Sequence, residues 1–455
     1  MKSPENHAAE SRQSHANYMR PVACAAAILF IFVWSASAQF QAQPEQVSPE
    51  AAGRYIVIFQ PGTPPAARVS SVRRAGASVR FNYEVVDAVA VGLAGADALA
   101  AMRQDRSVSA IIPDRVMHAI QNPIIDERQV QPFASSQTIP AGVRRVGRPT
   151  STSNGSGIGV AIIDTGIDFA HRDLAPSSQS FSAVVGTSCQ DDNGHGTHVS
   201  GIVAALNNTV DVVGVAPNAK LYCVKVLDRL GAGSDSQVMA GLDWVFTNHS
   251  LVSPGIRVVN MSLGRPGSLN DNPALRASIQ QLYNAGIVVV VAAGNDPGSE
   301  VSQMVPATYP EVFAVASTTA LGGTNSCFFL QGSIHADTAS YFTTDGKFDP
   351  ATRIGVTISV PGEDRENVNV ACVVNSVGIL STRLGGGTTR LSGTSMASPH
   401  VAGIVARLMQ SGAAGPENIR GIIRANADRK SIAPLDSPTA AYTFDGEREG
   451  VGKVQ

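Results

Sequence analysis

Charged residues are scarce in this 455-residue sequence: Asp, Glu, Lys and Arg make up 15%, and 34 basic against 36 acidic residues leave a net charge of −2. A chain with so little net charge has no broad basic surface for nucleic acid or an anionic membrane. Glycine and proline, with 43 and 26 residues, are too few for a low-complexity or collagen-like chain. Hydrophobic residues make up 44%, which allows a sizeable core and excludes general disorder.

The sequence also lacks an apolar run long enough for a membrane-spanning helix. Residues 21–34 form an apolar run of 14 residues, whereas a helix needs about 20 residues to cross a bilayer. Arg20 precedes this run and the small residues Ala36 and Ala38 follow it, an order typical of a secretory signal peptide. We therefore expect a signal peptide over residues 1–38 and a secreted protein, extracellular or periplasmic. An uncleaved anchor is the alternative.

Cysteine is rare too: the chain has five, of which Cys24 lies in the expected signal peptide. In an exported chain the remaining four predict two disulfides, for which three pairings exist. We favour pairing in order along the chain, Cys189 with Cys223 and Cys327 with Cys372. Each bond would close a loop of a few dozen residues and stabilise the fold by roughly 3–4 kcal/mol. Free buried thiols are the alternative.

The N-terminal third of the sequence divides into a linker, a small domain and a junction. Residues 39–52 are polar and contain proline, as a linker does. Residues 53–120 predict an α+β domain with the order β-α-β-β-α-β, which is typical of a ferredoxin-like fold. Its expected elements are strands at 54–60, within 79–93 and at 108–112, and helices at 66–76 and 96–103. Irregular residues 121–136 form the junction to the next domain.

From residue 159 the pattern changes to continuous apolar strands separated by helical segments. We expect strands at 159–166, 220–227, 257–262, 286–293 and 312–317, and helices at 195–206, 234–249 and 273–285. Non-alternating strands interleaved with helices predict an α/β fold, a parallel sheet with helices on both faces. Active sites of such sheets collect at the carboxyl ends of the strands. Residues 321–375 are less regular, and we expect strands and surface loops there.

Four polar residues lie at glycine-rich junctions between strands and helices: Asp164, His195, Asn295 and Ser395. A serine hydroxyl becomes a nucleophile when a base takes its proton, and the base needs a carboxylate to hold its tautomer. A side-chain amide at a strand end can donate to a developing oxyanion. Taken singly, each residue has a plainer explanation as a turn residue, a helix cap or a structural histidine. Together, and in this order, they fill the roles of nucleophilic catalysis.

The motifs around these residues resemble those of the subtilisin-like serine proteases (subtilases). AIIDTGID, NGHGTHVSG, VVNMSLG, AAGN and GTSMASPHVAG follow one another between residue 137 and about residue 409. The resemblance implies a subtilisin-like peptidase domain over residues 137–442, and we expect residues 443–455 to be a frayed C-terminal tail. Together with the small ferredoxin-like domain, this is the expected architecture.

The same resemblance implies the chemistry of a secreted serine endopeptidase. Asp164 would be the orienting acid, His195 the general base and then acid, and Ser395 the nucleophile that forms an acyl-enzyme. Asn295 and the Ser395 backbone N–H would form the oxyanion hole. A substrate would lie extended beside one segment, and a second segment would line the pocket for the residue before the cleaved bond. The first segment is Ser262, Leu263 and Gly264; the second is Ala292, Ala293 and Gly294.

Residues 53–120 resemble the inhibitory propeptides of this family, which act as intramolecular inhibitor and folding aid. Their last segment, IIPDRVMHAI, resembles the tail that lies in the active site as a product, so we expect autoprocessing near Ile120. A structural Ca²⁺ is also implied, because LNNTVDVVGVAP matches the calcium loop of the family. The expected ligands are Gln137, Asp173, Asn208 and the carbonyls of Leu206, Val210 and Val212. The mature protease is expected to be monomeric, with no nucleic-acid partner and no stable membrane span.

Substrate preference is left open by the sequence, because residues 296–305 differ in length and content from typical subtilisins. Met304 at the floor of the pocket would favour apolar side chains of limited size. Asp296 and Glu300 would instead attract basic ones.

Three other functions fit the sequence less well. An aspartic protease would explain Asp164-Thr165-Gly166, but that chemistry needs two such carboxylates and the motif occurs once. A zinc hydrolase would use His195 and His198, but HGTH lacks the glutamate of H-E-x-x-H and an evident third ligand. A secreted non-catalytic binding protein on a protease scaffold is disfavoured because all four chemical positions are filled.

Overall fold

The computed structural model describes residues 53–93, 95–120, 134, 136–439 and 447–454. The expected signal peptide and linker lie outside these residues, as does most of the expected junction. All described residues belong to one structural unit, in which the small domain contacts the large one. None of the helices in this part of the chain combines the length and apolar character that crossing a bilayer requires.

The small domain has the β-α-β-β-α-β order that the sequence predicts. Its elements are β1 (Arg54–Phe59), α1 (Pro65–Arg74), β2 (Ala77–Asn82), β3 (Ala88–Leu93), α2 (Ala96–Gln104) and β4 (Val108–Pro113). The strands form an antiparallel sheet in the order β2-β3-β1-β4. The alternate residues Val57 and Phe59 of β1 are buried with Val72 of α1 and Met102 of α2, so both helices cover one face of this sheet.

A seven-stranded parallel sheet forms the centre of the large domain, in the order β15-β14-β12-β10-β6-β8-β7. The strands are β6 (Gly159–Asp164), β7 (Phe181–Ser182), β8 (Lys220–Lys225), β10 (Ile256–Met261), β12 (Val288–Ala292), β14 (Val312–Thr319) and β15 (Val356–Glu363). The helices are α3 (Ala141–Val146), α4 (His195–Ala204), α5 (Asp235–Asn248), α6 (Pro273–Asn284), α7 (Thr394–Gln410) and α8 (Pro416–Ala425).

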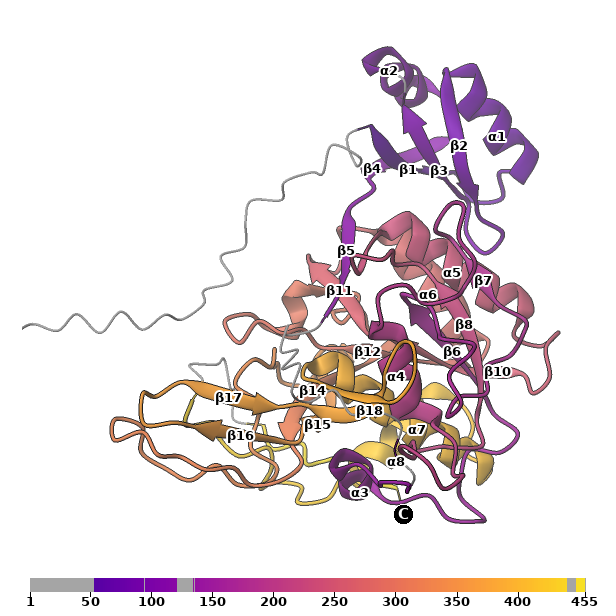
Figure 1. Ribbon diagram of the computed structural model, residues 1–455. Coiled ribbons are helices and arrows are strands. Elements are labelled where there is room, and N and C mark those ends of the chain that lie inside the picture. The colour runs from indigo at the N-terminus through magenta and orange to yellow at the C-terminus, as the bar shows by residue number, and fades with distance from the viewer. Residues whose placement is uncertain (1–52, 94, 121–133, 135, 440–446, 455) are drawn as a thin grey trace, which may run out of the picture. The chain divides into compact units, whose positions relative to one another are not determined.

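Helices cover both faces of this sheet (Figure 1). Ile163 of β6 packs in one apolar cluster with Leu242 of α5 and Ile279 of α6. Its neighbour Ile162 points the other way and packs in a second cluster with Ile202 of α4 and Ile404 of α7. Because both faces are buried, the strands are continuously apolar rather than alternating. The predicted fold class is therefore confirmed.

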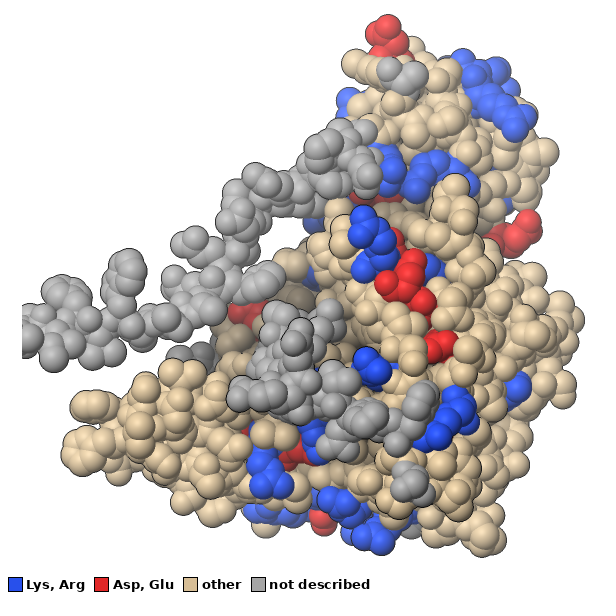
Figure 2. All heavy atoms as spheres, in the orientation of Figure 1, with Lys and Arg blue, Asp and Glu red and all other residues tan. Residues whose placement is uncertain are grey.

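Smaller sheets and one lobe complete the large domain. β5 (Val116–Ala119), β9 (Ala232–Ser234), β11 (Leu263–Pro266) and β13 (Met304–Val305) form a four-stranded sheet; β16 (Arg365–Val368) pairs with β17 (Val374–Val377), and β18 (Ile379–Thr382) with β19 (Thr388–Leu391). The β16–β17 hairpin and the loop after β14 form a lobe, the β16–β17 lobe, which carries the exposed apolar side chains of Phe328, Phe329 and Val370. Figure 2 shows that the outer part of this lobe presents no charged side chains on the visible face.

Both expected disulfides are present, Cys189–Cys223 and Cys327–Cys372. The first joins the loop before α4 to β8. The second joins the loop after β14 to the turn between β16 and β17, so it ties that loop to the hairpin turn. Within the irregular stretch 321–375 the structure has one strand of the central sheet, β15, which the sequence analysis did not separate from the surface loops.

The expectation of a frayed C-terminal tail is wrong for residues 447–454. Val451 is fully buried and forms bridges with Ser359 of β15 and with Asp428. Val454 is also buried, and its backbone N–H donates to the Val146 carbonyl at 2.8 Å. This segment therefore packs against the edge of the central sheet at Val451 and against α3 at Val454.

Candidate active site

Asp164 and His195 meet at the carboxyl end of the central sheet. Asp164 is the last residue of β6, and His195 is the first residue of α4. The Nδ1–H of His195 donates to Asp164 Oδ1 at 2.8 Å, and both side chains are buried. The other ring nitrogen, Nε2, is buried without a hydrogen-bond partner. A carboxylate on Nδ1 fixes the tautomer in which Nε2 is free to accept a proton.

Asp191, a residue that the sequence analysis missed, holds this pair together. Its Oδ1 accepts from the Thr165 hydroxyl at 2.9 Å and from the Gly194 N–H at 3.0 Å, and its Oδ2 accepts from the Thr197 N–H at 2.9 Å. One buried carboxylate thus joins the end of β6 to the first turn of α4. A signal was present in the sequence, because an acidic residue just before a helix N-terminus is a frequent cap.

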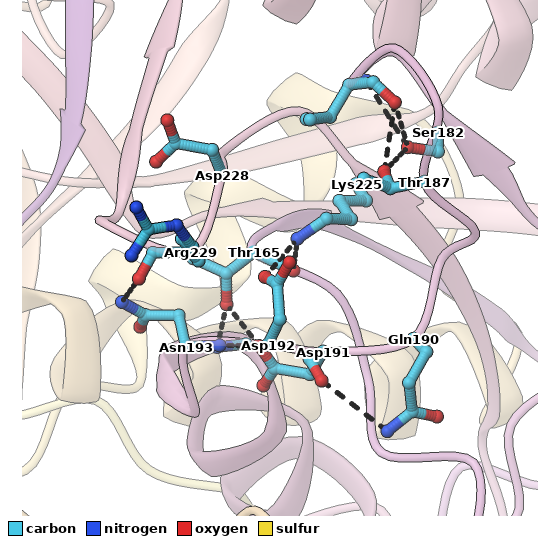
Figure 3. Close-up of polar contacts among 12 residues, drawn as sticks. Thr165, Ser182, Thr187, Gln190, Asp191, Asp192, Asn193, Lys225, Asp228 and Arg229 are labelled. Atoms are coloured by element: carbon cyan, nitrogen blue, oxygen red, sulfur yellow. Dashed lines mark hydrogen bonds and ion pairs between the residues drawn. The ribbon is translucent and has the colours of Figure 1, made fainter.

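A buried lysine supports the same loop (Figure 3). Lys225 ends β8 and is fully buried; its Nζ pairs with Asp192 Oδ1 at 2.7 Å and donates to the Thr165 carbonyl. Asn193 Nδ2 donates to the Arg229 carbonyl at 3.1 Å, which ties the loop to the turn after β8. These contacts fix the loop that places His195 over the end of β6.

Ser395 lies in the first turn of α7, and its hydroxyl contacts the strand end that holds Ser262. Ser395 Oγ donates to the Ser262 carbonyl at 3.0 Å, and the Ser262 hydroxyl donates to the Ser395 carbonyl at 2.9 Å. The hydroxyl therefore makes no bond to His195 in this structure, where the unpartnered Nε2 stays available. Nucleophile–base bonds of this kind often form only with substrate present.

Asn295 is tied to the residue that precedes Ser395. Its Oδ1 accepts from the backbone N–H of Thr394 and from the Thr394 hydroxyl, both at 2.9 Å. Its amide nitrogen is buried and has no partner. A buried N–H donor without an acceptor is costly unless a ligand supplies one. The amide is thus held beside Ser395 with an unused donor, as an oxyanion hole requires.

β5, the strand that ends one residue before Ile120, lies beside β11, along which the sequence predicts that a substrate binds (Figure 1). β5 pairs antiparallel with β11 on one side, where Ala119 faces Leu263, and with β9 on the other. The Ile120 N–H donates to the Ser262 carbonyl at 3.2 Å, the same carbonyl that the Ser395 hydroxyl contacts. The chain therefore passes the serine at residue 120.

The first of the two expected pocket segments contacts Ile120. The side chain of Ile120 lies against Gly264, where a Cβ would meet Ile120 Cδ1 at 2.9 Å. Ala292 ends β12 and is followed by Ala293 and Gly294, and the Met304 methyl group lies so close to Gly294 that a Cβ there would be 3.0 Å away. Met304 thus contacts the predicted pocket wall.

Asp296 and Glu300 are engaged in their own loop. Asp296 accepts from the Gly298 N–H at 3.0 Å and from the Ser299 hydroxyl at 2.7 Å. Glu300 forms a reciprocal capping box with Gln303 around η2 (Val301–Gln303). These contacts favour the apolar alternative for the pocket over the basic one.

The six residues expected to bind calcium form an oxygen cage. Gln137 Nε2 lies 2.7 Å from the Leu206 carbonyl, 3.3 Å from Asn208 Oδ1, 3.4 Å from the Val210 carbonyl and 3.1 Å from the Val212 carbonyl. An amide nitrogen has two protons and cannot serve four acceptors.

The fully buried Asp173 adds a carboxylate beside this cage, bonded to Asn208 Nδ2 at 2.8 Å and to the Val212 N–H at 3.0 Å. A cage of carbonyl, amide and carboxylate oxygens fits a hard cation such as Ca²⁺, with the Gln137 amide turned to present its oxygen.

The two histidines of the zinc alternative do not converge. His198 Nε2 donates to the carbonyls of Ile379 and Thr389, at 3.1 and 3.3 Å, away from the Asp164–His195 pair. Burial, with a smaller contribution from the charge of His195, lowers the pKa of His198 to about 3. Among the described residues no cluster of three His, Cys, Asp or Glu side chains is placed to hold a metal.

Comparison with known proteins agrees with this geometry. Residues 155–448 match the model of the subtilase family. The chain is 32% identical over 378 residues to subtilisin amylosacchariticus of Bacillus subtilis subsp. amylosacchariticus, covering 80% of this chain and 83% of that protein. It is 33% identical over 365 residues to subtilisin J of Geobacillus stearothermophilus, covering 78% and 80%. This chain belongs to the subtilase family.

This subtilase is accordingly a serine endopeptidase, and the family resemblance inferred from the motifs is confirmed. An alkaline protease of Alkalihalobacillus alcalophilus is 35% identical over 287 residues, covering 62% of this subtilase and 63% of that protein. The roles of Asp164, His195, Ser395 and Asn295 stay predictions at this point, as do the calcium ligands.

Proposed function

We propose that this subtilase hydrolyses peptide bonds through Ser395, with His195 as general base and Asp164 as the acid that orients it. The observation that carries the proposal is the Ser262 carbonyl, which accepts both the Ile120 N–H and the Ser395 hydroxyl. The hydroxyl is therefore beside the backbone of a strand that enters the site as a substrate would. His195 supplies a buried nitrogen with no other partner.

In the reaction, Ser395 Oγ bonds to the carbonyl carbon of the residue before the cleaved bond while its proton moves to His195 Nε2. The carbonyl oxygen becomes an oxyanion, and the Asn295 amide and the Ser395 N–H donate to it. His195 then gives the proton to the leaving amine, and an acyl-enzyme forms. Water, deprotonated by His195, releases the acyl group and restores the serine. Because the base must be neutral, activity should be highest at neutral to alkaline pH.

Residues 53–120 act in this proposal as an inhibitory propeptide, and the first cut falls after Ile120. In support, β5 fills the position between β11 and β9, and Asp164, His195 and Ser395 are buried. A strand held by both neighbours blocks the site until it leaves. N-terminal sequencing of the mature protease tests the cut: a first residue Gln121 supports it, and Ser395→Ala should leave the chain uncut.

The cage at Gln137 would hold a structural Ca²⁺ in the mature protease. The residues that surround it come from the start of the large domain, from the loop after β6 and from the loop after α4. When bound, the ion supplies positive charge that ties these three segments together. It takes no part in the bond cleavage.

Secretion is part of the same proposal, since two disulfides suit an oxidising compartment and the relatives are proteases of bacterial origin. A fluorophosphonate probe tests the enzyme directly because it labels only an activated serine. We expect labelling of the mature protein and none of Ser395→Ala. Unlabelled mature wild-type protein, or a labelled Ser395→Ala variant, would count against the proposed nucleophile.

A further inference from the structure

An acidic cluster borders the far end of the strand that fills the active site. Arg265 of β11 is buried, and its Nε and Nη2 donate to Asp235 at 3.0 and 2.7 Å. The same guanidinium donates to Asp271 at 2.8 and 3.2 Å. Burial alone would lower the pKa of Arg265, but the hydrogen bonds and charges of Asp235 and Asp271 outweigh it and raise the pKa.

Within the large domain this cluster is not electrically balanced. One guanidinium faces two carboxylates, so Arg265, Asp235 and Asp271 together carry one net negative charge. The fourth member comes from the small domain: Arg115 Nη1 contacts Asp271 Oδ2 at 2.9 Å. Asp271 keeps 12% of its side-chain surface exposed and Arg115 31%, so the contact lies at the surface.

Among the described residues, the neighbouring ion pairs do not change this balance. Arg80 pairs with Asp114 at 3.1 Å, and Arg276 pairs with Glu311 at 3.1 Å. Each of these pairs is neutral by itself. Arg115 therefore supplies a positive charge that faces Asp271 from the small domain, and in the proposed processing it leaves with the propeptide.

The position of Arg115 along the strand is fixed by backbone contacts. The Asp235 N–H donates to the Arg115 carbonyl at 2.9 Å, and the Ile120 N–H donates to the Ser262 carbonyl at 3.2 Å. Counted back from Ile120 as the first residue, Arg115 is the sixth. A substrate bound along the same path would bring the side chain of its sixth residue to Asp271.

We propose that Asp271, oriented by Arg265 and Asp235, forms a substrate subsite for a basic side chain, Arg or Lys, six residues before the cleaved bond. This inference rests on the proposed function, because it takes β5 as the path of the substrate. The contact holds the remote part of a peptide and leaves the reacting groups untouched.

A peptide series tests the subsite on the mature protease. The peptides carry the chain's own sequence Val-Met-His-Ala-Ile before the cleaved bond, preceded by Arg, Lys, Gln or Glu. We expect kcat/KM to be about fivefold higher for Arg than for Gln, the size of a partly exposed ion pair, and lowest for Glu. Because the pair is partly exposed, 1 M NaCl should reduce the Arg preference towards one.

Variants locate the effect. Asp271→Asn should bring the Arg-to-Gln ratio close to one. Asp436→Asn is the matched control, because it removes an exposed carboxylate that pairs with Arg448 outside the strands around β5, and the ratio should stay near five. If Asp271→Asn fails to fold, the wild-type ratio and its salt dependence decide the question.

Two results separate this inference from the proposed function. A wild-type ratio of one, with every peptide cleaved, overturns the subsite and leaves the protease intact. No cleavage of any peptide and no labelling by the fluorophosphonate overturn both.

Discussion

His400, in the middle of α7, gives a stability prediction whose size follows from the structure. The side chain is fully buried, and its Nδ1–H donates to the Met396 carbonyl at 2.8 Å. Its Nε2 has no partner and faces the backbone of Gly142 in α3, so a second proton would meet no acceptor. Burial therefore lowers the pKa of His400 to about 4 from an ordinary value of 6.5.

The sign of the pH dependence follows from this lowered pKa. A group whose pKa is lower in the folded than in the unfolded chain stabilises the fold above its unfolded pKa, and the stability is lost as the pH falls towards the folded value. For His400 the full contribution is about 3 kcal/mol. Between pH 7.5 and pH 5.0 the loss is about 2 kcal/mol.

Replacement of His400 by Leu removes this titration. In a Ser395→Ala background, which prevents self-digestion, denaturant titration gives the free energy of unfolding at pH 7.5 and 5.0. We expect the decrease between these pH values to be about 2 kcal/mol smaller in His400→Leu than in its parent. At pH 7.5 the variant should be less stable by about 1 kcal/mol, for the lost hydrogen bond.

His335→Gln serves as the control for the removal of a histidine, because His335 is exposed and lies outside α7. The reasoning would be refuted if the free energy of unfolding decreased equally in the parent and in His400→Leu between pH 7.5 and 5.0. Such a result would mean that His400 takes up its proton as readily in the folded chain as in the unfolded one.

Four further changes address the site and its supports. Asp164→Asn should lower kcat/KM for a peptide about 10⁴-fold in steady-state kinetics, a magnitude known from other serine proteases. Asn295→Ala should lower kcat about 10²–10³-fold while KM changes little, because it removes a donor used in the transition state. Replacing Cys189 and Cys223 by Ala opens a loop with a sequence separation of 34 and should cost about 3–4 kcal/mol in denaturant titrations. A chelator should shorten the half-life of the mature protease at elevated temperature, and Asp173→Asn should remove most of that response; an unchanged half-life would argue against the cation.

The sequence predicted best those features of the site that depend on a local residue pattern, namely the ends of strands and the starts of helices. Asp164 and Asn295 follow continuous apolar runs, and in a parallel sheet the carboxyl ends of such runs share one edge. The glycines beside His195 and Ser395 mark the starts of helices. The positions of these residues in the sequence therefore predict that they lie in one region. The Ser395 hydroxyl bonds to Ser262 and not to His195, and this depends on a side-chain rotation that no motif encodes.

The features that the sequence left unassigned depend on distant partners. β15 contains Pro361 and Gly362, which are unusual in a buried strand. Gly362 is required there because a Cβ would collide with Ser317 of β14 and with the Gly393 backbone, which precedes α7. Residues 447–454 have no apolar run at all, so only the burial of Val451 against β15 reveals their role. Neither contact is visible without the fold.

The arrangement of β5 explains how one site can be blocked and then open to many peptides. β5 forms backbone hydrogen bonds with the facing edges of β11 and β9. When β5 leaves, the N–H and C=O groups of both edges are exposed on the two sides of a gap one strand wide. Backbone pairing of that kind accepts any extended peptide and selects none. Selection must then come from the side-chain positions along the gap, where Ile120 meets Gly264 at one end and Arg115 meets Asp271 at the other. The first position is apolar and close to the serine, while the second is charged and remote, and because binding energy of remote groups can also lower the reaction barrier, changes at either position should alter kcat/KM.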